Sequence, residues 1–288
     1  MSHKQIVILY HADCPDGFGG AYAAWKKFAD TAMYIPMKYR QEPPLAEIEG
    51  CEVYVVDFCY HQEAMDRILK AAKSLVVLDH HEGVQEVVES MPEHVYDANR
   101  SGATIAWEYF HPGTPVPKLL KHIEDDDLYR FNLPETRALL AYLSVQPYAF
   151  ESWDLIAREL EEERARGDLI ARAEIYLDYF NHLVELSTAH AHPVHFEGHT
   201  VLLATAAPIK PLKSAIGHAL NQKMPPFGLV VSVHPNGLGV SIRGDGSIDV
   251  SSIARKYGGN GHPNSSGFHI PWQLPMPFTS AEHEDPRH

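Results

Sequence analysis

The chain is poor in several features that would narrow its class at once. It has three cysteines in 288 residues, and their spacing fits neither a paired zinc motif nor a disulfide framework. We therefore interpret Cys14, Cys51 and Cys59 as free thiols. No apolar run approaches the roughly 18 residues of a membrane-spanning helix, and a strand pattern begins within the first residues. These absences predict a cytoplasmic protein that has no membrane partner.

Positive charge is also scarce. Lys and Arg number 24 against 38 Asp and Glu, which leaves a formal net charge of −14. Sequence-independent affinity for nucleic acid comes mainly from Lys and Arg on phosphates, so this balance argues against a broad surface for long duplexes. A small anionic substrate stays compatible with the charge if metal ions supply the positive counterpart. With 45% hydrophobic residues, the chain is long enough for two domains.

Histidine and carboxylate side chains follow three apolar runs, which are typical of buried strands. The runs cover residues 5–10, 52–56 and 74–78, and they lead into His11, Asp13 and Asp16, into Asp57, and into Asp79, His80 and His81. Helical patterns separate the runs, and strands that alternate with helices indicate a parallel sheet. Ligands bind at the carboxyl ends of such strands. The sequence thus predicts one polar site built from three strand ends.

Two α/β domains joined by a helical connector are expected. The first domain, residues 1–150, takes its strands from residues 5–10, 33–37, 52–57, 75–78 and 94–96. Residues 151–192 are predicted to form a long charged helical connector. The second, smaller domain covers residues 193–275, with a strand or strand pair at 195–206, helices at 211–223 and 248–257, and a hairpin around Pro235-Asn-Gly237. The polar, proline-rich residues 276–288 are expected to be a disordered tail.

Further carboxylates come from residues 118–131, predicted as a helix that carries Asp125, Asp126 and Asp127. With the strand ends they make a set of carboxylates and imidazoles without thiolates, which suits Mn²⁺ or Mg²⁺ better than a structural zinc ion. Asp57 lies between the other strand ends in sequence, and we expect it to bridge two cations. Two cations roughly 3.5–4 Å apart would activate a water for in-line hydrolysis of a phosphoester or a phosphoanhydride.

Five motifs in this order resemble the DHH phosphoesterase family with its associated C-terminal domain. They are His11-Ala-Asp-Cys-Pro-Asp-Gly17, Val56-Asp57, Asp79-His-His81, Glu124-Asp125 and Gly258-Gly-Asn-Gly-His262. The resemblance covers about residues 5–272. It implies a two-Mn²⁺ hydrolase, with Mg²⁺ or Co²⁺ as alternatives, whose active site lies in a cleft between the two domains. In this chain two residues separate Asp13 from Asp16, where the family usually has one.

The resemblance also implies roles for individual residues. One metal would be held by His11, Asp13 and Asp57, and the other by Asp16, Asp57, His80 and Asp125, with Asp127 as the alternative to Asp125. Asp79 would orient the ring of His80, and His81 would face the scissile phosphate as a substrate contact or proton donor. The distal phosphate or nucleoside would be bound by Arg243, Gly258, Gly259, Asn260, Gly261 and His262. Ser101 is predicted either to cap a helix or to donate to a phosphate.

The compact form of the chain resembles the nanoRNase and pAp-phosphatase group of this family. It lacks the added nucleic-acid-binding domains of RecJ-type exonucleases and the membrane or sensory segments of cyclic-dinucleotide phosphodiesterases. We therefore expect a phosphoesterase that acts on short oligonucleotides or small nucleotides, with a homodimer left open. A hydrolase of phosphoanhydrides such as pyrophosphate, polyphosphate or dinucleoside polyphosphates is the alternative. A non-catalytic nucleotide-binding module is a third reading, which loss of the metal ligands would favour.

Overall fold

A computed structural model describes residues 5–38 and 41–280 of the chain. The chain divides into two compact units, Met1–Leu177 and Asp178–His288. Unit 1 therefore takes in the first predicted domain and part of the predicted connector. Of the predicted tail, Thr279–Ser280 form a short strand, and residues 281–288 lie outside the described part of the chain.

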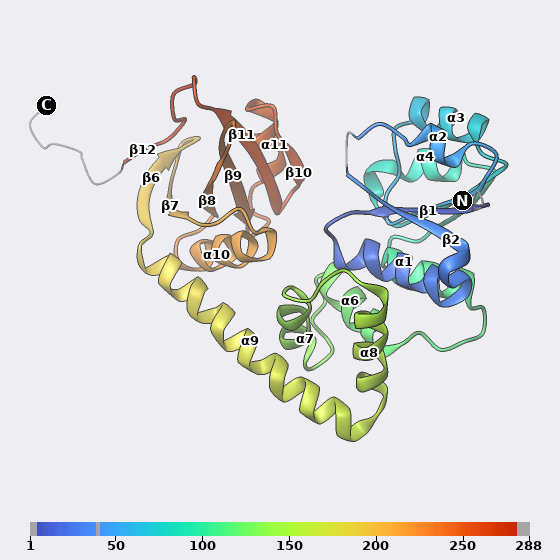
Figure 1. Ribbon diagram of the computed structural model, residues 1–288. Coiled ribbons are helices and arrows are strands. Elements are labelled where there is room, and N and C mark those ends of the chain that lie inside the picture. Colours follow the sequence, from blue (N-terminus) through green and yellow to red (C-terminus); the bar gives the residue numbers. More distant parts are fainter. Residues whose placement is uncertain (1–4, 39–40, 281–288) are drawn as a thin grey trace, which may run out of the picture. The chain divides into compact units, whose positions relative to one another are not determined.

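Unit 1 is built on a five-stranded parallel sheet (Figure 1). Its strands are β1 (Ile6–His11), β2 (Ala32–Met37), β3 (Glu52–Val56), β4 (Ser74–Asp79) and β5 (Glu93–Tyr96), in the order β2-β1-β3-β4-β5. Tyr10 pairs with Val56 and Val56 pairs with Leu78, so three strands end at the same level. This register confirms the predicted parallel sheet and brings the residues that follow β1, β3 and β4 to one edge.

Helices cover both faces of this sheet because successive strand residues point to opposite sides. Val7 and Leu9 enter the core on one face, and Ile8 enters the core on the other. The first face carries α2 (Leu45–Ile48), α3 (Gln62–Ala71) and α4 (Gln85–Glu89), and the second carries α1 (Pro15–Phe28), α5 (Gly102–Phe110), α6 (Lys118–Asp127), α7 (Thr136–Leu143) and α8 (Phe150–Glu161). Two 3₁₀ turns, Ala29–Thr31 and Glu82–Val84, complete the unit.

Two predicted helices end earlier than the sequence suggested. The helix expected over residues 118–131 stops at Asp127, and the backbone then turns back, with the Arg130 and Phe131 amides donating to the carbonyl of Asp125. The helical region that begins near residue 150 breaks after Glu161, and α9 (Glu163–Ala189) follows. The boundary between the two units falls inside α9.

Unit 2 contains a seven-stranded sheet in which only β7 and β8 run parallel. Its strands are β6 (His192–Phe196), β7 (His199–Thr205), β8 (Phe227–His234), β9 (Gly237–Gly244), β10 (Asn260–His262), β11 (Ser265–Pro271) and β12 (Thr279–Ser280). The two faces are covered by α10 (Lys210–Lys223) and α11 (Val250–Lys256). The glycine-rich motif at residues 258–262 is partly strand, since β10 pairs with β11.

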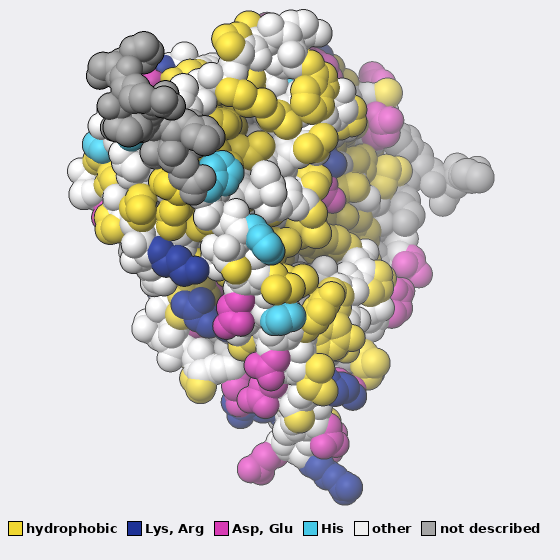
Figure 2. Space-filling view, turned by 90° about the vertical axis from the view of Figure 1, so that its left-hand side faces the viewer, with side chains coloured by type: hydrophobic (Ala, Val, Ile, Leu, Met, Phe, Trp, Pro, Cys, Tyr) yellow, Lys and Arg dark blue, Asp and Glu magenta, His cyan; other side chains and the backbone are white. Residues whose placement is uncertain are grey.

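Charged side chains of both signs are mixed on the surface. On the face drawn in Figure 2, Lys and Arg side chains stand singly or in small groups among Asp and Glu side chains. This distribution agrees with the net charge of −14. No helix within residues 5–38 and 41–280 combines the length and the hydropathy that a membrane crossing requires.

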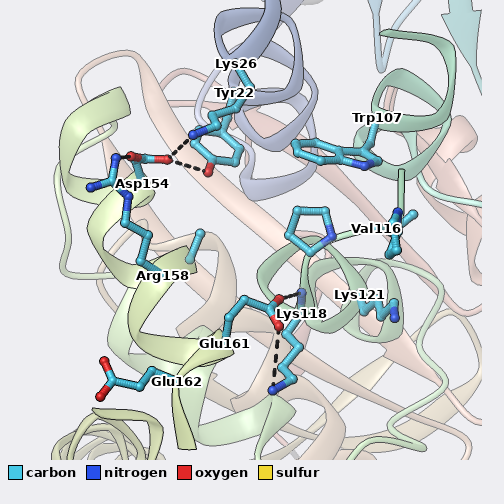
Figure 3. A pocket seen from close by; sticks show the side chains of 13 residues that line it. Tyr22, Lys26, Trp107, Val116, Lys118, Lys121, Asp154, Arg158, Glu161 and Glu162 are labelled. Carbon is cyan, nitrogen blue, oxygen red and sulfur yellow. Dashed lines mark hydrogen bonds and ion pairs between the residues drawn. The ribbon is translucent and has the colours of Figure 1, made fainter. Parts of the chain in front are cut away.

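A cavity of about 650 Å³ opens among α1, α5, α6 and α8 of unit 1 (Figure 3). Asp154 of α8 is 5% exposed at its wall. Its carboxylate accepts from the hydroxyl of Tyr22 at 2.9 Å, from Lys26 Nζ at 2.7 Å and from the guanidinium of Arg158. These bonds join α8 to α1, and none of the residues predicted for the site lines this cavity.

We expect Asp154→Ala to lower the free energy of unfolding by about 2–4 kcal/mol, because it leaves a tyrosine hydroxyl and a lysine ammonium without their acceptor. Urea denaturation followed by circular dichroism measures this change. Glu162→Ala is the matched control, since Glu162 lines the same cavity but is exposed. An equal loss in both variants would show that the Asp154 network contributes nothing specific.

Candidate metal centre

Asp57 stands at the middle of the strand edge, directly after β3. Its carboxylate is 1% exposed, and its two oxygens face different histidines. Oδ2 lies 3.3 Å from Nδ1 of His11, which ends β1, and Oδ1 lies 3.2 Å from Nε2 of His80, which follows β4. One carboxylate therefore lies between the histidines of both neighbouring strand ends. This is the position expected of a bridging ligand.

The backbone of Asp57 is strained, and a glycine makes room for it. Its φ of 61° lies in the left-handed region, which costs energy for any residue other than glycine and occurs often at functional sites. Gly102, the first residue of α5, packs directly against it. A Cβ on Gly102 would lie 2.6 Å from Cβ and 2.9 Å from Cα of Asp57. The close approach of α5 to the strand edge thus requires glycine at this position.

Asp16 reaches the same site from the first turn of α1. Its carboxylate, 1% exposed, accepts from the amides of Gly102 at 2.6 Å and Ala103 at 3.0 Å. These amides belong to the first turn of α5, where backbone donors and the helix dipole favour a negative charge. Oδ2 of Asp16 also lies 3.6 Å from Nε2 of His80. Asp16 therefore faces the second histidine, as the resemblance implied.

The structure places Asp127, and not Asp125, beside His80. Oδ2 of Asp127 is 3.5 Å from Nε2 of His80. The carboxylate of Asp125 turns away and accepts from the amides of Asn132 at 2.7 Å and Leu133 at 3.1 Å, and from the Thr136 hydroxyl at 2.6 Å. The preference for Asp125 is thus corrected: its oxygens bind the segment after α6, and the alternative, Asp127, is the carboxylate that lies beside His80. Its role as a metal ligand stays a prediction.

Glu124 ties the helix that carries Asp127 to the helix that holds Asp16. Its carboxylate accepts from the amide of Ser101 at 3.1 Å, from Arg100 Nε at 2.9 Å and from the hydroxyl of Thr104. The partners belong to the start of α5, and Glu124 lies one turn before the end of α6. The sequence flagged Glu124 only as part of a motif, and its positioning contacts could not be read from it.

Asp79 contacts the ring of His81, which corrects the prediction that it orients the ring of His80. Its Oδ1 lies 2.7 Å from Nδ1 of His81 and accepts from the amides of His80 at 2.7 Å and His81 at 3.1 Å. Burial alone would lower the pKa of His81, but the bond to Asp79 raises it to about 9. His81 is therefore held through Nδ1, and its predicted contact with a substrate stays a prediction.

Asp13 does not present its side chain to the site. It is 71% exposed and pairs with Lys38 Nζ at 2.7 Å, so its assignment as a ligand is corrected. Ser101 is 0% exposed, and its hydroxyl caps α5 by accepting from the Thr104 amide at 3.4 Å. The Ser101 side chain also hydrogen-bonds to the carboxylate of Asp16, and its predicted contact with a phosphate stays a prediction. Cys14 is buried, and its sulfur lies within 4.8 Å of ligand atoms of His11 and Asp57.

The residues present fit divalent cations. Asp57 Oδ1, Asp79 Oδ2 and His80 Nε2 are buried and have no hydrogen-bond partner among the described residues. Burial, and then the charges of Asp57 and Asp127, raise the pKa of Asp16 well above its usual value. Buried, crowded carboxylates are costly unless positive charge offsets their repulsion. Among the described residues, three overlapping sets of ligand atoms could hold a metal ion: His11, Cys14 and Asp57; Asp16, His80 and Asp127; and Asp57, Asp79, His80 and His81.

Arg243 and His262 lie in one row of the sheet in unit 2. Arg243 pairs with Ser265, and Ser265 pairs with His262, so their side chains share a face across three strands. Arg243 donates through Nε to the Ser214 hydroxyl at 3.1 Å. Burial, and then the charge of Arg243, lower the pKa of Lys213. Lys213 was missed by the sequence analysis, because no motif marks it and only the fold sets it beside Arg243.

The glycines of the predicted substrate-binding motif, residues 258–262, have a structural role. The amides of Gly258 and Gly259 donate to the carbonyls of Arg255 and Ala254, which ends α11, and Gly258 has the positive φ of 73° common at helix ends. Asn260, Gly261 and His262 are exposed on the edge strand β10. Their part in substrate binding stays a prediction.

No protein-family model matches the chain. A relative from Acanthamoeba polyphaga mimivirus, described as uncharacterized protein R106, is 29% identical over 286 residues. The match covers 91% of this chain and 66% of the relative, so the chain spans about two thirds of that protein. The relative's description names no activity.

Solved structures share the fold at low sequence identity. A DHH domain described as a member of a family of ribosomal proteins matches with a TM-score of 0.51 at 14% identity, over 93% of this chain and 83% of that one. The chain has the DHH-domain fold. An exopolyphosphatase-related protein from Bacteroides fragilis matches at 0.58 and 13%, over 95% and 88%. The pGpG-specific phosphodiesterase PggH from Vibrio cholerae matches at 0.54 and 11%, over 94% of each chain.

We expect Gly102→Ala to disturb this DHH-fold site, because the added methyl group overlaps the backbone of Asp57. The free energy of unfolding should fall by about 1–3 kcal/mol, and Mn²⁺ binding measured by calorimetry should weaken. Gly167→Ala is the control, since nothing lies within 4 Å of its added carbon, and alanine in a helix should stabilise slightly. Unchanged Mn²⁺ affinity in Gly102→Ala would contradict the close fit of α5 to the strand edge.

Proposed function

We propose that the chain is a metal-dependent phosphoesterase that hydrolyses short oligonucleotides or small nucleotides. The observation that carries this proposal is the buried Asp57 carboxylate with one oxygen toward His11 and the other toward His80. Asp16 and Asp127 face the same His80 nitrogen. Such a set of ligands around one bridging carboxylate supports a two-cation centre, with Mn²⁺ as the first choice for the cluster of carboxylates and imidazoles.

Each residue then has a physical task. Bound cations would neutralise phosphoryl oxygens and lower the pKa of a water. Asp57 would be held in common by the two cation positions, while the α5 amides fix the Asp16 oxygens in place. Asp79 holds Nδ1 of His81, so Nε2 of His81 can donate a hydrogen bond or a proton to the substrate. In the site without cations, hydrogen bonding to Asp79 outweighs burial and raises the pKa of His81 to about 9, which favours a ring that carries this proton.

Two features support a small substrate over a long duplex. The chain carries a formal charge of −14, and the face in Figure 2 shows basic side chains mixed with acidic ones. A neighbour of the same fold acts on pGpG, as its name states. We propose the cytoplasm as the compartment, which suits three free, buried cysteines. Phosphoanhydrides are the second candidate substrates, because one structural neighbour is described as exopolyphosphatase-related.

A substrate panel tests the proposal directly. The metal-stripped protein, with and without Mn²⁺, is incubated with pAp, dinucleotides, cyclic dinucleotides, pyrophosphate and diadenosine tetraphosphate, and the products are separated by chromatography. We expect Mn²⁺-dependent release of nucleoside monophosphate from pAp or the dinucleotides. Cleavage of only pyrophosphate or the tetraphosphate would favour the second candidate, and full turnover after exhaustive chelation would overturn the metal mechanism.

We expect Asp57→Asn to lower kcat by roughly 100-fold or more, because the substitution removes the charge shared by both cation positions and keeps the side-chain shape. Steady-state kinetics with the best substrate of the panel measures the loss. Asp66→Asn on the exposed side of α3 is the control and should keep wild-type rates. A wild-type rate in Asp57→Asn would mean that the bridge has been misplaced.

We expect Arg243→Ala to act mainly on KM for nucleotide substrates. A charge-assisted Arg–phosphate contact contributes on the order of 1.5–3 kcal/mol, so kcat/KM should fall roughly ten- to a hundredfold. The small ester bis(p-nitrophenyl) phosphate has no distal group to hold and should be nearly unaffected. Equal losses on both substrates would place Arg243 at the reacting phosphate instead and would refute its role as a distal grip.

A further inference from the structure

The sulfur of Cys14 is part of the candidate metal centre. Its Sγ, a ring nitrogen of His11 and a carboxylate oxygen of Asp57 all lie within 4.8 Å of one another. Cys14 comes directly before the first residue of α1, and it is 8% exposed. Three side chains from two strand ends and one helix start thus point their ligand atoms at a common position.

The backbone conformation of residue 13 determines which nearby side chain points into the candidate metal centre. Asp13 has a φ of 55°, in the left-handed region, and its carboxylate turns outward to Lys38. The following residue then faces inward, so the buried side chain is a thiol where the sequence suggested a carboxylate. Asp13 cannot take the position of Cys14 without undoing this turn.

The carboxylate of Asp57 gives a second reason to expect a cation at this position. Its side chain is 1% exposed, with Oδ2 toward His11 and Oδ1 toward Nε2 of His80, and Oδ1 makes no well-aligned hydrogen bond among the described residues. A buried carboxylate is costly unless positive charge meets it. The carboxylate that belongs to the Cys14 group is therefore suited to a bound cation.

The other two cysteines show what structural thiols look like in this chain. Both are buried, and both donate to backbone carbonyls, Cys51 to Glu47 at 3.7 Å and Cys59 to Tyr60 at 3.3 Å. They lie within hydrophobic core on the α3 side of the sheet. Cys14 instead has an imidazole and a carboxylate as its ligating neighbours.

We propose that Cys14 supplies a thiolate ligand to the cation position shared by His11 and Asp57. This inference rests on the proposed metal centre and adds to it that the two cation positions are unequal. The position with sulfur favours a softer ion such as Zn²⁺, Co²⁺ or Cd²⁺, while Asp16, His80 and Asp127 offer only oxygen and nitrogen and suit Mn²⁺. When the sulfur–metal bond forms, the thiol S–H bond breaks and its proton passes to solvent, with no change of oxidation state.

Cobalt spectroscopy on the full-length, metal-stripped protein tests the proposal. Co²⁺ alone is titrated in, its binding is counted by calorimetry, and the near-ultraviolet spectrum is recorded for a thiolate-to-cobalt charge-transfer band. We expect the band in the wild type and in the double variant Cys51→Ser/Cys59→Ser, which keeps Cys14 as its single thiol. Bound Co²⁺ without this band would overturn the proposal, and this holds even if substitution of Cys14 itself prevents folding.

Direct substitution provides the second arm. Cys14→Ser should lose the band and bind Cd²⁺ roughly tenfold or more weakly, as expected for loss of a soft ligand, with a smaller change for Mn²⁺. Cys14→Asp should also lose the band but should bind Mn²⁺ at least as tightly as the wild type. Unchanged Cd²⁺ affinity in Cys14→Ser would refute thiolate ligation.

The same preparations separate this inference from the proposed function. Hydrolysis of bis(p-nitrophenyl) phosphate is measured beside each spectrum. A charge-transfer band without any hydrolysis would leave Cys14 as a ligand and reject the phosphoesterase. Metal-dependent hydrolysis without the band would keep the phosphoesterase and reject the thiolate.

Discussion

The structure of unit 1 depends on keeping buried carboxylates together at one strand edge. Asp16 and Asp57 are each 1% exposed, and Asp127 approaches the same histidine nitrogen as both. Burial, and then repulsion from the like charges of Asp57 and Asp127, raises the pKa of Asp16. Amides of α5 and the imidazoles of His11 and His80 offset part of this repulsion. Divalent cations would offset the remainder, so metal binding and the stability of unit 1 should be thermodynamically linked.

The fold makes this burial possible because separate contacts hold each of these side chains in position. Parallel strands in matched register bring three chain segments to one edge, and the first turns of α1 and α5 begin there, where helix amides favour anions. Gly102 allows α5 to approach Asp57 closely. Glu124 fastens α6 to the start of α5, so that Asp127 at the end of α6 is placed by contacts on the same helix that orders Asp16. The ligands are therefore positioned before any cation arrives.

The sequence was sufficient to place those candidate ligands whose positions follow directly from strand periodicity. His11, Asp57 and His80 each end or follow a buried strand, and the parallel order of those strands determines that they meet. The sequence was insufficient where the conformation of a local turn determines which of two nearby residues points its side chain into the site. Asp13 and Cys14 exchange places because residue 13 adopts a positive φ, and Asp125 yields to Asp127 because the segment after α6 folds back onto the Asp125 carboxylate. Periodicity carries no information about either choice.

A metal centre of this kind does not distinguish an ester from an anhydride, since it neutralises phosphoryl oxygens in both. Discrimination has to come from groups that touch the rest of the substrate. Unit 2 offers the row of His262, Ser265 and Arg243, which spans two strand spacings or roughly 10 Å, with Lys213 beside it. Such a row is long enough for one phosphate and its adjoining sugar but short for an extended strand. In a chain of net charge −14, local cations also act on nearby anions with little competition from a wider basic surface. On the proposed function, discrimination between substrates is therefore expected to depend on side chains outside the metal centre, and this row is a candidate for that role.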